Sequence, residues 1–208
     1  MTTVSASVTN RPGFTVWLTG LSGAGKTTLA LALESELRRR NVPVERLDGD
    51  VVRESLTRDL GFSREDRDKN VERVGFVAKL LARNGVGVVA AFISPYRAAR
   101  EKLRGDIVNF IEVHIDASLE TCMARDVKGL YAKALAGQVT QFTGVDDPYE
   151  VPEQPELTIH TDQETPAESV ARILHYLEDR GLIPPAAHVD SVHQPAQIDT
   201  LPERNAHA

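Results

Sequence analysis

A run of eight residues near the N-terminus has the types and spacing of a phosphate-binding loop. It reads Gly20-Leu21-Ser22-Gly23-Ala24-Gly25-Lys26-Thr27 and fits the pattern G-x-x-x-x-G-K-[ST]. Its glycines let the backbone turn tightly, so that N–H groups and the start of a following helix face an anion. The lysine can reach the β- and γ-phosphates, and the threonine hydroxyl can bind Mg²⁺ directly. The run therefore predicts binding of a nucleoside triphosphate with Mg²⁺.

The flanking residues support this interpretation. Phe14–Thr19 is aromatic and β-branched, which is typical of a buried strand. Residues 28–37 are rich in strong helix formers, with leucines four apart that would share one helix face. A strand, a loop and a helix in this order are the context the motif requires, whereas an isolated match could be an ordinary glycine-rich turn.

Two carboxylates follow a second predicted strand, residues 44–47. Asp48 and Asp50 are separated by one glycine, and side chains two apart in an extended segment point the same way. We therefore expect both to face the phosphate site. One would hold the water shell of the metal and the other the acceptor hydroxyl, which is what phosphoryl transfer needs. The alternative is an aspartate pair in a polar turn.

Basic and aromatic side chains further along the chain could bind an acceptor. Arg67 and Asn70 lie three apart on a predicted helix and share a face, and with Arg53 they could clamp an oxyanion. Phe62 and Phe142 stand beside glycine-containing turns and could enclose a nucleobase. The competing interpretations are a solvated helix face for the polar residues and core packing for the phenylalanines.

The segment from 125 to 144 contains Arg125, Lys128 and Lys133 among polar residues and glycines. We expect a mobile lid without regular structure, which would close over the phosphate site and expel water. A solvated loop is the alternative.

Strands and helices alternate along the chain, which predicts a three-layer α/β fold of the P-loop NTPase type with a mainly parallel sheet. Ligands of such sheets bind beyond the carboxyl ends of the strands, where the phosphate loop, the aspartates and Ser94 all fall. The expected strands, besides the first two, are 86–93, 110–115 and 157–160. The expected helices, besides the first, are 51–57, 63–83, 98–104, 119–125 and 166–180.

Composition describes an ordinary globular protein. The 208 residues are 41% hydrophobic and 26% charged, with a net charge of −6. The one basic run, Arg38-Arg39-Arg40, ends a predicted helix, so neither nucleic acid nor membrane is expected as a partner. A single cysteine, Cys122, excludes an intrachain disulfide, suits a cytoplasmic location and is expected to be buried and inert.

We divide the chain into a flexible arm, residues 1–12, a kinase domain, residues 13–183, and a disordered tail, residues 184–208. The tail is rich in Pro, Ala, His and Gln and has no periodicity. We expect the 208 residues to form one α/β domain with a sizeable core.

Seven segments together resemble the adenylyl-sulfate kinases (APS kinases), which phosphorylate adenosine 5′-phosphosulfate (APS). The resemblance runs from about Gly13 to Pro184. The segments are residues 20–27, Leu47-Asp48-Gly49-Asp50, Asp59-Leu60-Gly61-Phe62-Ser63, Asp66-Arg67 with Asn70, Phe92-Ile93-Ser94-Pro95-Tyr96-Arg97, Lys128-Gly129-Leu130-Tyr131, and Phe142-Thr143-Gly144-Val145-Asp146-Asp147-Pro148-Tyr149-Glu150.

The resemblance implies transfer of the ATP γ-phosphate to the 3′-hydroxyl of APS, giving PAPS and ADP with Mg²⁺. ATP would bind to residues 20–27, Thr28 and Arg125, with Lys26 catalytic, Thr27 on the metal and Asp48 on it through water. The APS positions would be Asp50, Arg53, Phe62, Arg67, Asn70, Ile93, Ser94, Lys128, Leu130, Phe142 and Thr143. A homodimer and a separate ATP sulfurylase partner are also implied. The family's serine is traditionally called a phosphoserine intermediate, but we expect direct in-line transfer with Ser94 positioning the acceptor.

The chain departs from the family's usual pattern at a few positions, where Val51, Glu54, Ser55 and Val127 stand. These departures leave open a second interpretation, a P-loop kinase for a different small acceptor. A nucleotide-dependent switch is a third, but the guanine-binding motif of GTPases is absent. Loss of Lys26 or of the aspartate pair would mark a degenerate kinase, and all three residues are retained.

Overall fold

Five parallel strands form the centre of the computed structural model, which describes residues 11–185, in the order β2-β3-β1-β4-β5. The strands are β1 (Phe14–Thr19), β2 (Val44–Asp48), β3 (Gly87–Ala91), β4 (Phe110–Asp116) and β5 (Leu157–His160). The helices are α1 (Lys26–Arg39), α2 (Gly49–Glu54), α3 (Arg64–Arg83), α4 (Arg97–Asp106), α5 (Leu119–Arg125), α6 (Leu130–Leu135) and α7 (Pro166–Asp179). The predicted parallel α/β fold is confirmed. The predicted arm and tail fall almost entirely outside the described residues.

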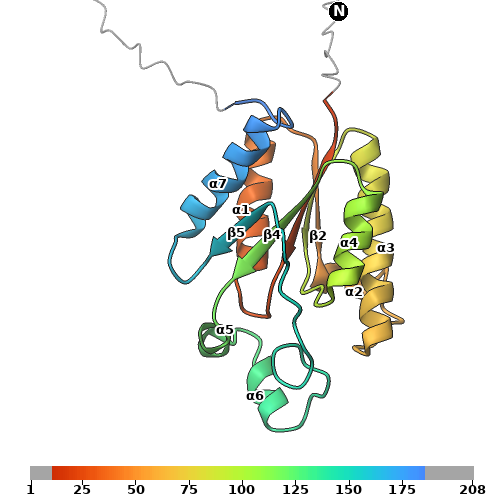
Figure 1. The fold of residues 1–208 in the computed structure, drawn as a ribbon, viewed down its shortest axis with the longest axis vertical. Helices are drawn as coiled ribbons and strands as arrows, with labels where there is room; N and C mark the ends of the chain where they lie inside the picture. Colours follow the sequence, from red (N-terminus) through yellow and green to blue (C-terminus); the bar gives the residue numbers. More distant parts are fainter. Residues whose placement is uncertain (1–10, 186–208) are drawn as a thin grey trace, which may run out of the picture.

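Helices cover both faces of the sheet, which makes three layers (Figure 1). α1 and α7 pack together on one face, and α3 and α4 pack together on the other. β1 is buried along its whole length. Its side chains pack on both faces of the sheet, because successive side chains of a strand point to opposite faces. Val16 and Leu18 join the core under α1 and α7, whereas Trp17 joins the core under α3 and α4 and stacks on Phe92, with ring centroids 5.4 Å apart.

The turn that follows β2 differs from the prediction. Asp48 does not start an extended segment, because its side chain accepts a hydrogen bond of 3.1 Å from the backbone N–H of Asp50 and caps α2. Aspartate is a favoured N-cap residue, so the helix begins at Gly49, two residues earlier than predicted. Asp48 is extended as the last residue of β2, but the expectation of extended chain was wrong for Asp50, which lies in α2. Asp48 is buried, and Asp50 is exposed on the first turn of the helix.

A short helix, α6, lies in the segment predicted to lack regular structure. Oδ1 and Oδ2 of Asp126 accept hydrogen bonds of 3.1 Å from the N–H groups of Tyr131 and Ala132. Tyr131 and Ala134 are buried, three residues apart on one face. Six residues with two buried side chains give too weak a periodic pattern to predict a helix. The long helix α3 is confirmed, and its predicted cap at Ser63 accepts a hydrogen bond of 3.2 Å from the N–H of Asp66.

The carboxyl ends of the strands meet at one edge of the sheet, next to α5 and α6 (Figure 1). The phosphate loop follows β1, Asp48 ends β2, and the loop carrying Ser94 follows β3, so the three predicted segments are neighbours as expected. Within the described residues, no helix combines the length and the apolar character that a membrane span requires.

Candidate active site

The phosphate loop joins β1 to α1 in a conformation that depends on glycine. Gly23 and Gly25 have φ angles of 77° and 100°, in the left-handed region that other residues rarely adopt. Gly25 is the N-cap of α1 and no side chain caps the helix, so its first N–H groups remain available to an anion. Nζ of Lys26 donates hydrogen bonds to the carbonyls of Gly20 (2.9 Å) and Leu21 (2.7 Å). The ammonium is thus held inside its own loop.

The environment of Lys26 lowers the pKa of its ammonium group. Burial lowers the pKa of this ammonium to about 8, and the nearby Lys128 ammonium acts in the same direction. A phosphate bound at the loop would raise this pKa again, because an anion favours the charged lysine. The site is therefore electrostatically suited to a polyanion at neutral pH.

The loop ends in contact with the carboxylate of β2. Oγ1 of Thr27 donates a hydrogen bond of 3.0 Å to Oδ2 of Asp48. The other oxygen, Oδ1, caps α2, so that Asp48 is fixed at both oxygens. Arg46 also lies 3.5 Å from Oδ2. A hydroxyl and a carboxylate are oxygen ligands of the kind Mg²⁺ prefers, and Mg²⁺ in such sites takes one or two protein groups besides phosphates and water. These residues fit the predicted metal site. Thr28 is exposed on the same first turn.

Asp50 contacts the segment from 125 to 144, for which a lid was predicted. Its carboxylate forms an ion pair with the ammonium of Lys128, which lies between α5 and α6, and both side chains are largely exposed. Residues 78 positions apart in sequence are thereby joined near Lys26 of the phosphate loop, whose pKa both charges affect. The structure places the second predicted aspartate opposite the lid.

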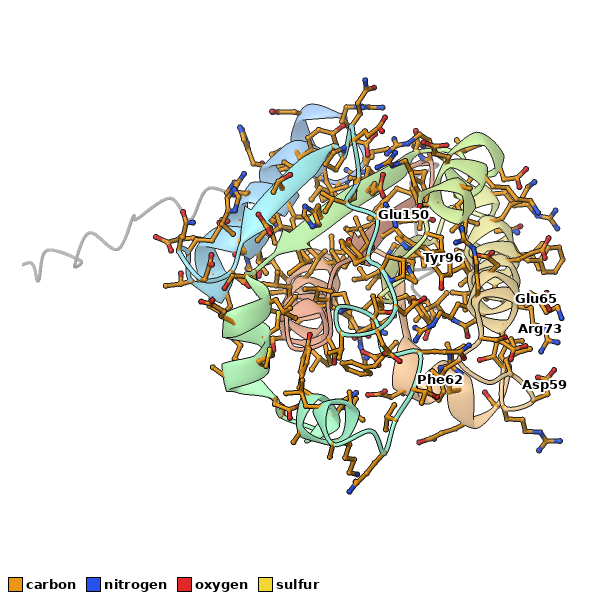
Figure 2. The ribbon with its side chains drawn as sticks, turned by 60° about the horizontal axis from the view of Figure 1, so that its bottom comes forward. Asp59, Phe62, Glu65, Arg73, Tyr96 and Glu150 are labelled. Carbon is orange, nitrogen blue, oxygen red and sulfur yellow. The ribbon has the colours of Figure 1, made fainter. Side chains whose placement is uncertain are left out.

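Two guanidinium groups surround the ring of Phe62. Cζ of Arg53 lies 4.4 Å from the ring centroid and Cζ of Arg67 lies 5.7 Å from it. Burial, and next the charge of Arg67, lower the pKa of Arg53. Two cations held this close repel each other, which favours an anion between or beside them. Phe62 itself is 55% exposed at the start of α3, in view at the carboxyl end of the sheet (Figure 2).

Arg67 also brings the two predicted aromatic positions together. It donates from Nε to the carbonyl of Phe62 (2.9 Å) and from Nη2 to the carbonyl of Gln141, the residue before Phe142. Asn70 lies one turn further along α3, and both it and Arg67 are buried. Oδ1 of Asn70 has no hydrogen-bond partner in the described part of the chain, as expected of a group that awaits a ligand. A solvated helix face is excluded for both residues.

Helix α6 packs against the phosphate loop. The ring of Tyr131 meets Phe142 edge to face, with centroids 5.0 Å apart, and its hydroxyl donates to the carbonyl of Ser22 (3.0 Å). Phe142 and Thr143 are buried, and Leu130 packs partly buried against the core. The two phenylalanines thus differ, because Phe62 is exposed whereas Phe142 is part of the core.

Ser94, a predicted acceptor-binding residue, is buried, and its hydroxyl both accepts and donates a hydrogen bond. Oγ accepts a hydrogen bond of 3.0 Å from Nε1 of Trp17 and donates one of 3.0 Å to Oγ1 of Thr19. The Thr19 hydroxyl in turn donates to the carbonyl of Ile93 (2.8 Å) and lies 3.0 Å from the hydroxyl of Tyr149. Burial raises the pKa of Tyr149 to about 12, so its phenol keeps the proton it donates to Thr19. This arrangement suits a group that positions rather than reacts.

Arg125 and Thr161 hold the loop from the side of β5. Arg125 donates to the carbonyl of Gly23 (3.3 Å) and, from Nη2, to the carbonyl of Thr161 (2.8 Å). Oγ1 of Thr161 donates to the carbonyl of Ala24 (2.7 Å). Sequence reasoning missed Thr161, because a lone threonine after a short strand carries no signal. It also assigned no role to Thr19 or to Tyr149, although Tyr149 lies in a matched segment.

The sequence model of the family described as Adenylylsulphate kinase matches residues 12–160. The chain belongs to the adenylylsulphate kinase family.

Individual members of the family agree with this assignment. The probable adenylyl-sulfate kinase of Pseudomonas aeruginosa is 62% identical over 163 residues, covering 78% of this chain and 76% of the relative. The adenylyl-sulfate kinase of Halothermothrix orenii is 56% identical over 174 residues, covering 84% and 94%. The solved structure of the APS kinase CysC of Mycobacterium tuberculosis, in complex with AMPPNP and APS, has a TM-score of 0.77 at 43% identity and covers 81% of this chain and 99% of its own.

Two departures from the usual adenylyl-sulfate kinase pattern lie on the surface. Val51 is 59% exposed in α2, next to Asp50, and Val127 is 87% exposed, next to Lys128. Neither valine fills the core, so each is tolerated by the fold. Cys122 is buried as predicted, and burial raises the pKa of its thiol.

Proposed function

We propose that this chain is an adenylyl-sulfate kinase, which transfers the γ-phosphate of ATP to the 3′-hydroxyl of APS and yields PAPS and ADP. One observation carries the proposal beyond family membership. Lys128, in the predicted lid, pairs with Asp50 near Lys26 of the phosphate loop, whose pKa both charges affect. A phosphate donor bound on one side of this ion pair and a hydroxyl acceptor bound on the other side would both lie next to the carboxylate of Asp50.

The phosphate loop binds the donor. Nζ of Lys26 leaves the carbonyls of Gly20 and Leu21 and donates to the β- and γ-phosphates, while free N–H groups at the start of α1 hold their oxygens. Arg125, which is anchored on Gly23 and Thr161, is proposed as a further ATP-binding residue. Charge neutralisation and alignment account for most of the rate in such transfers.

The two arginines and two phenylalanines bind the acceptor. Arg53, Arg67 and Asn70 take the phosphosulfate oxygens, because a guanidinium binds an oxyanion in two-point fashion. Phe62 and Phe142 enclose the adenine. The exposed ring closes onto the base, whereas the buried ring is already in place.

Asp50 orients the acceptor hydroxyl. When APS binds, the carboxylate exchanges Lys128 for the 3′-hydroxyl, and the lysine turns to the incoming phosphates. The hydroxyl oxygen then bonds to the γ-phosphorus in line with the bond to the β–γ bridging oxygen, which breaks to release ADP. The hydroxyl proton passes to Asp50 and on to solvent.

We also propose Mg²⁺ as the metal, held directly by Thr27 and through water by Asp48. When bound, Mg²⁺ neutralises charge on the β- and γ-phosphates. The hydrogen bond between the two side chains holds these oxygen ligands side by side.

Ser94 is proposed to position the acceptor. Its hydroxyl already donates to Thr19 and accepts from Trp17, and these two hydrogen bonds hold it in place as a positioning group. Phosphoserine at Ser94, detected by rapid quench at a rate matching turnover, would overturn direct transfer.

The function is tested by coupled ADP release with Mg-ATP and APS, beside adenosine 5′-phosphate and no acceptor. Turnover that requires APS is the expected result. ATP binding without APS-dependent turnover would favour the alternative, a P-loop kinase for another small acceptor, and the residues from Asp50 to Asn70 would then be searched for its binding site.

A homodimer in the cytoplasm, supplied with APS by a separate ATP sulfurylase, is our proposal for the cellular context. Its support is the family membership and the single buried cysteine, which suits a reducing compartment. Light scattering of the purified chain would test the dimer.

A further inference from the structure

Ser94 has a strained backbone. Its φ angle is 39°, in the left-handed region, although it is not glycine, and it is 3% exposed. Such a conformation is strained and persists only where the surroundings determine it from several sides. The hydroxyl bonds to Trp17 and Thr19 fix the side chain, but they leave the carbonyl free to turn.

Arg100 holds that carbonyl. It lies on the first turns of α4, is 1% exposed, and donates from Nη1 to the carbonyl of Ser94 (2.6 Å). Nη2 donates to the carbonyl of Glu150 (2.6 Å), and Nε pairs with Oε1 of Glu112 on β4 (2.6 Å). One planar guanidinium thus joins a helix, a strand and two loops.

The two loops are held to each other beside this contact. The N–H of Glu150 donates to the carbonyl of Pro95 (2.9 Å), and its Oε2 accepts from the N–H of Arg97 (2.8 Å). Tyr96 donates to both oxygens of Asp147 at 3.0 Å. Figure 2 shows Tyr96 and Glu150 close together, where the chain returns from α6 towards β5.

The contacts form a closed circuit. Arg100 bonds to Ser94, the Ser94 hydroxyl bonds to Thr19, Thr19 lies 3.0 Å from the hydroxyl of Tyr149, and Glu150, next to Tyr149, bonds back to Arg100. Thr19 directly precedes the first glycine of the phosphate loop. A change at Arg100 would therefore act first on the loop that carries Ser94 and on the chain at Glu150, to which it bonds directly.

We propose that Arg100 is a positioning residue for the acceptor side of the site, which sets the orientation of Ser94 and joins its loop to the chain that returns from the lid. The effect on APS rests on the proposed function. Arg100 touches no substrate, and it acts through the Ser94 carbonyl. Lysine cannot replace it, because an ammonium on a flexible stem lacks the planar fork that reaches three fixed acceptors.

The test uses Arg100→Lys with Arg104→Lys as the matched control. Arg104 lies one turn further along α4 and pairs with the other oxygen of Glu112 (2.9 Å) and with Glu156, but it has no bond to Ser94 or Glu150. Both variants keep the charge and disturb the same buried carboxylate. Only the first removes the hold on the Ser94 carbonyl.

Trp17 supplies a readout that needs no turnover. It is the sole tryptophan of the chain, and its indole N–H donates to Ser94 Oγ, so one indole resonance in a ¹H–¹⁵N spectrum reports the position of Ser94. We expect Arg100→Lys to shift this resonance and Arg104→Lys to leave it in place. We also expect Arg100→Lys to raise KM for APS about tenfold or more, with KM for ATP within about twofold, the change that loss of 1.4 kcal/mol or more of acceptor binding produces.

An unmoved indole resonance in folded Arg100→Lys would overturn the proposal. So would equal increases of KM for APS and for ATP, because a general loss of structure affects both substrates. If Arg100→Lys does not fold, Glu112→Gln tests the same clamp, since the amide oxygen still accepts from Nε while the countercharge is gone. A shift of the indole resonance supports the proposal there too, and its absence contradicts it. An enzyme without APS turnover that still shows the indole shift would contradict the proposed function and leave the positioning role standing.

Discussion

Oγ1 of Thr27, at the end of the phosphate loop, donates a hydrogen bond of 3.0 Å to Oδ2 of Asp48, at the end of β2. This contact ties the donor loop to the strand end that leads into the acceptor residues. The same carboxylate caps α2 through Oδ1, so the turn that presents Asp50 is set by the residue that faces the metal position. Two predicted functions, metal binding and acceptor binding, are thereby coupled through one side chain.

Asp48→Asn is predicted to lower kcat by about 100-fold, the order of effect seen when one preorganised electrostatic group is removed. Asparagine caps helices about as well as aspartate, so the melting temperature should stay nearly unchanged. Steady-state kinetics and calorimetry measure the two quantities. Asp59→Asn is the control, because Asp59 is exposed and pairs only with surface Arg73. A kcat within twofold of the wild type would rule out the role of Asp48.

Asp50→Asn is predicted to remove turnover while sparing ATP binding. The amide can still accept a hydrogen bond from the acceptor hydroxyl, but it cannot take up its proton at neutral pH. Lys128 also loses its ion-pair partner, and both side chains are exposed, so stability should change little. Coupled ADP release and nucleotide titration separate the two effects. Wild-type turnover in this variant would contradict the mechanism.

ATP affinity is predicted to fall as the pH rises above about 8. Burial lowers the pKa of Lys26 from its usual 10.5 to about 8, and only the protonated form attracts phosphates. Affinity should therefore drop by up to roughly tenfold per pH unit above that value.

The stability effect of Lys26 has the opposite direction. Because the folded-state pKa is the lower one, burying the ammonium costs stability below pH 8, and this cost is relieved as the pH rises from about 8 towards 10.5.

Titrations of the protein with ATP between pH 7 and 9.5 test the predicted fall in ATP affinity. Lys26→Arg, which stays charged, should bind ATP with a flat pH profile, and a fall in ATP affinity equal to that of the wild type would point to another group.

Phe62→Ala and Phe142→Ala are predicted to separate binding from stability. Each should raise KM for APS by about 5- to 100-fold, which corresponds to the 1–3 kcal/mol of one aromatic stack on a base. Phe62 is 55% exposed and Phe142 is 7% exposed. Loss of Phe142 should therefore also destabilise the fold by about 3 kcal/mol or more, and loss of Phe62 by at most ~1 kcal/mol. Kinetics and thermal unfolding of both variants provide the check. Equal losses of stability would contradict the burial difference.

Thr161→Val is predicted to weaken ATP binding by up to roughly tenfold, because it removes one hydrogen bond worth about 0.5–1.5 kcal/mol to the phosphate loop. The lost bond to the loop is the one from Oγ1 to the carbonyl of Ala24, and Oγ1 also no longer accepts the hydrogen bond of 3.2 Å from Nη1 of Arg125. KM for APS should not change, since Thr161 lies on the donor side. Thr158→Val on β5 is the matched control, and an equal effect there would assign the change to the strand rather than to the loop contact. Calorimetric titration with a non-hydrolysable ATP analogue measures the affinity.

Much of the fold could be predicted because its signals are local. Continuous apolar runs such as Phe14–Thr19 predict buried strands, and the apolar spacing along α3 predicts a helix whose observed cap is Ser63. The start of α2 and the whole of α6 could not be predicted. In each case a helix of six residues depends on an aspartate, Asp48 or Asp126, whose carboxylate accepts backbone hydrogen bonds. Such a carboxylate looks the same in the sequence whether it caps a helix or faces solvent.

The phosphate loop was determined by the sequence alone, because its function depends on neighbouring residues whose glycines permit backbone angles of 77° and 100°. The tertiary structure decided which distant side chains surround it. Asp50 meets Lys128 across 78 residues, Thr161 reaches Ala24 across 137, and Arg100 draws Glu150 to Ser94. Pairs of this kind depend on the order of the strands and on the path of each crossover, and no local periodicity encodes either one.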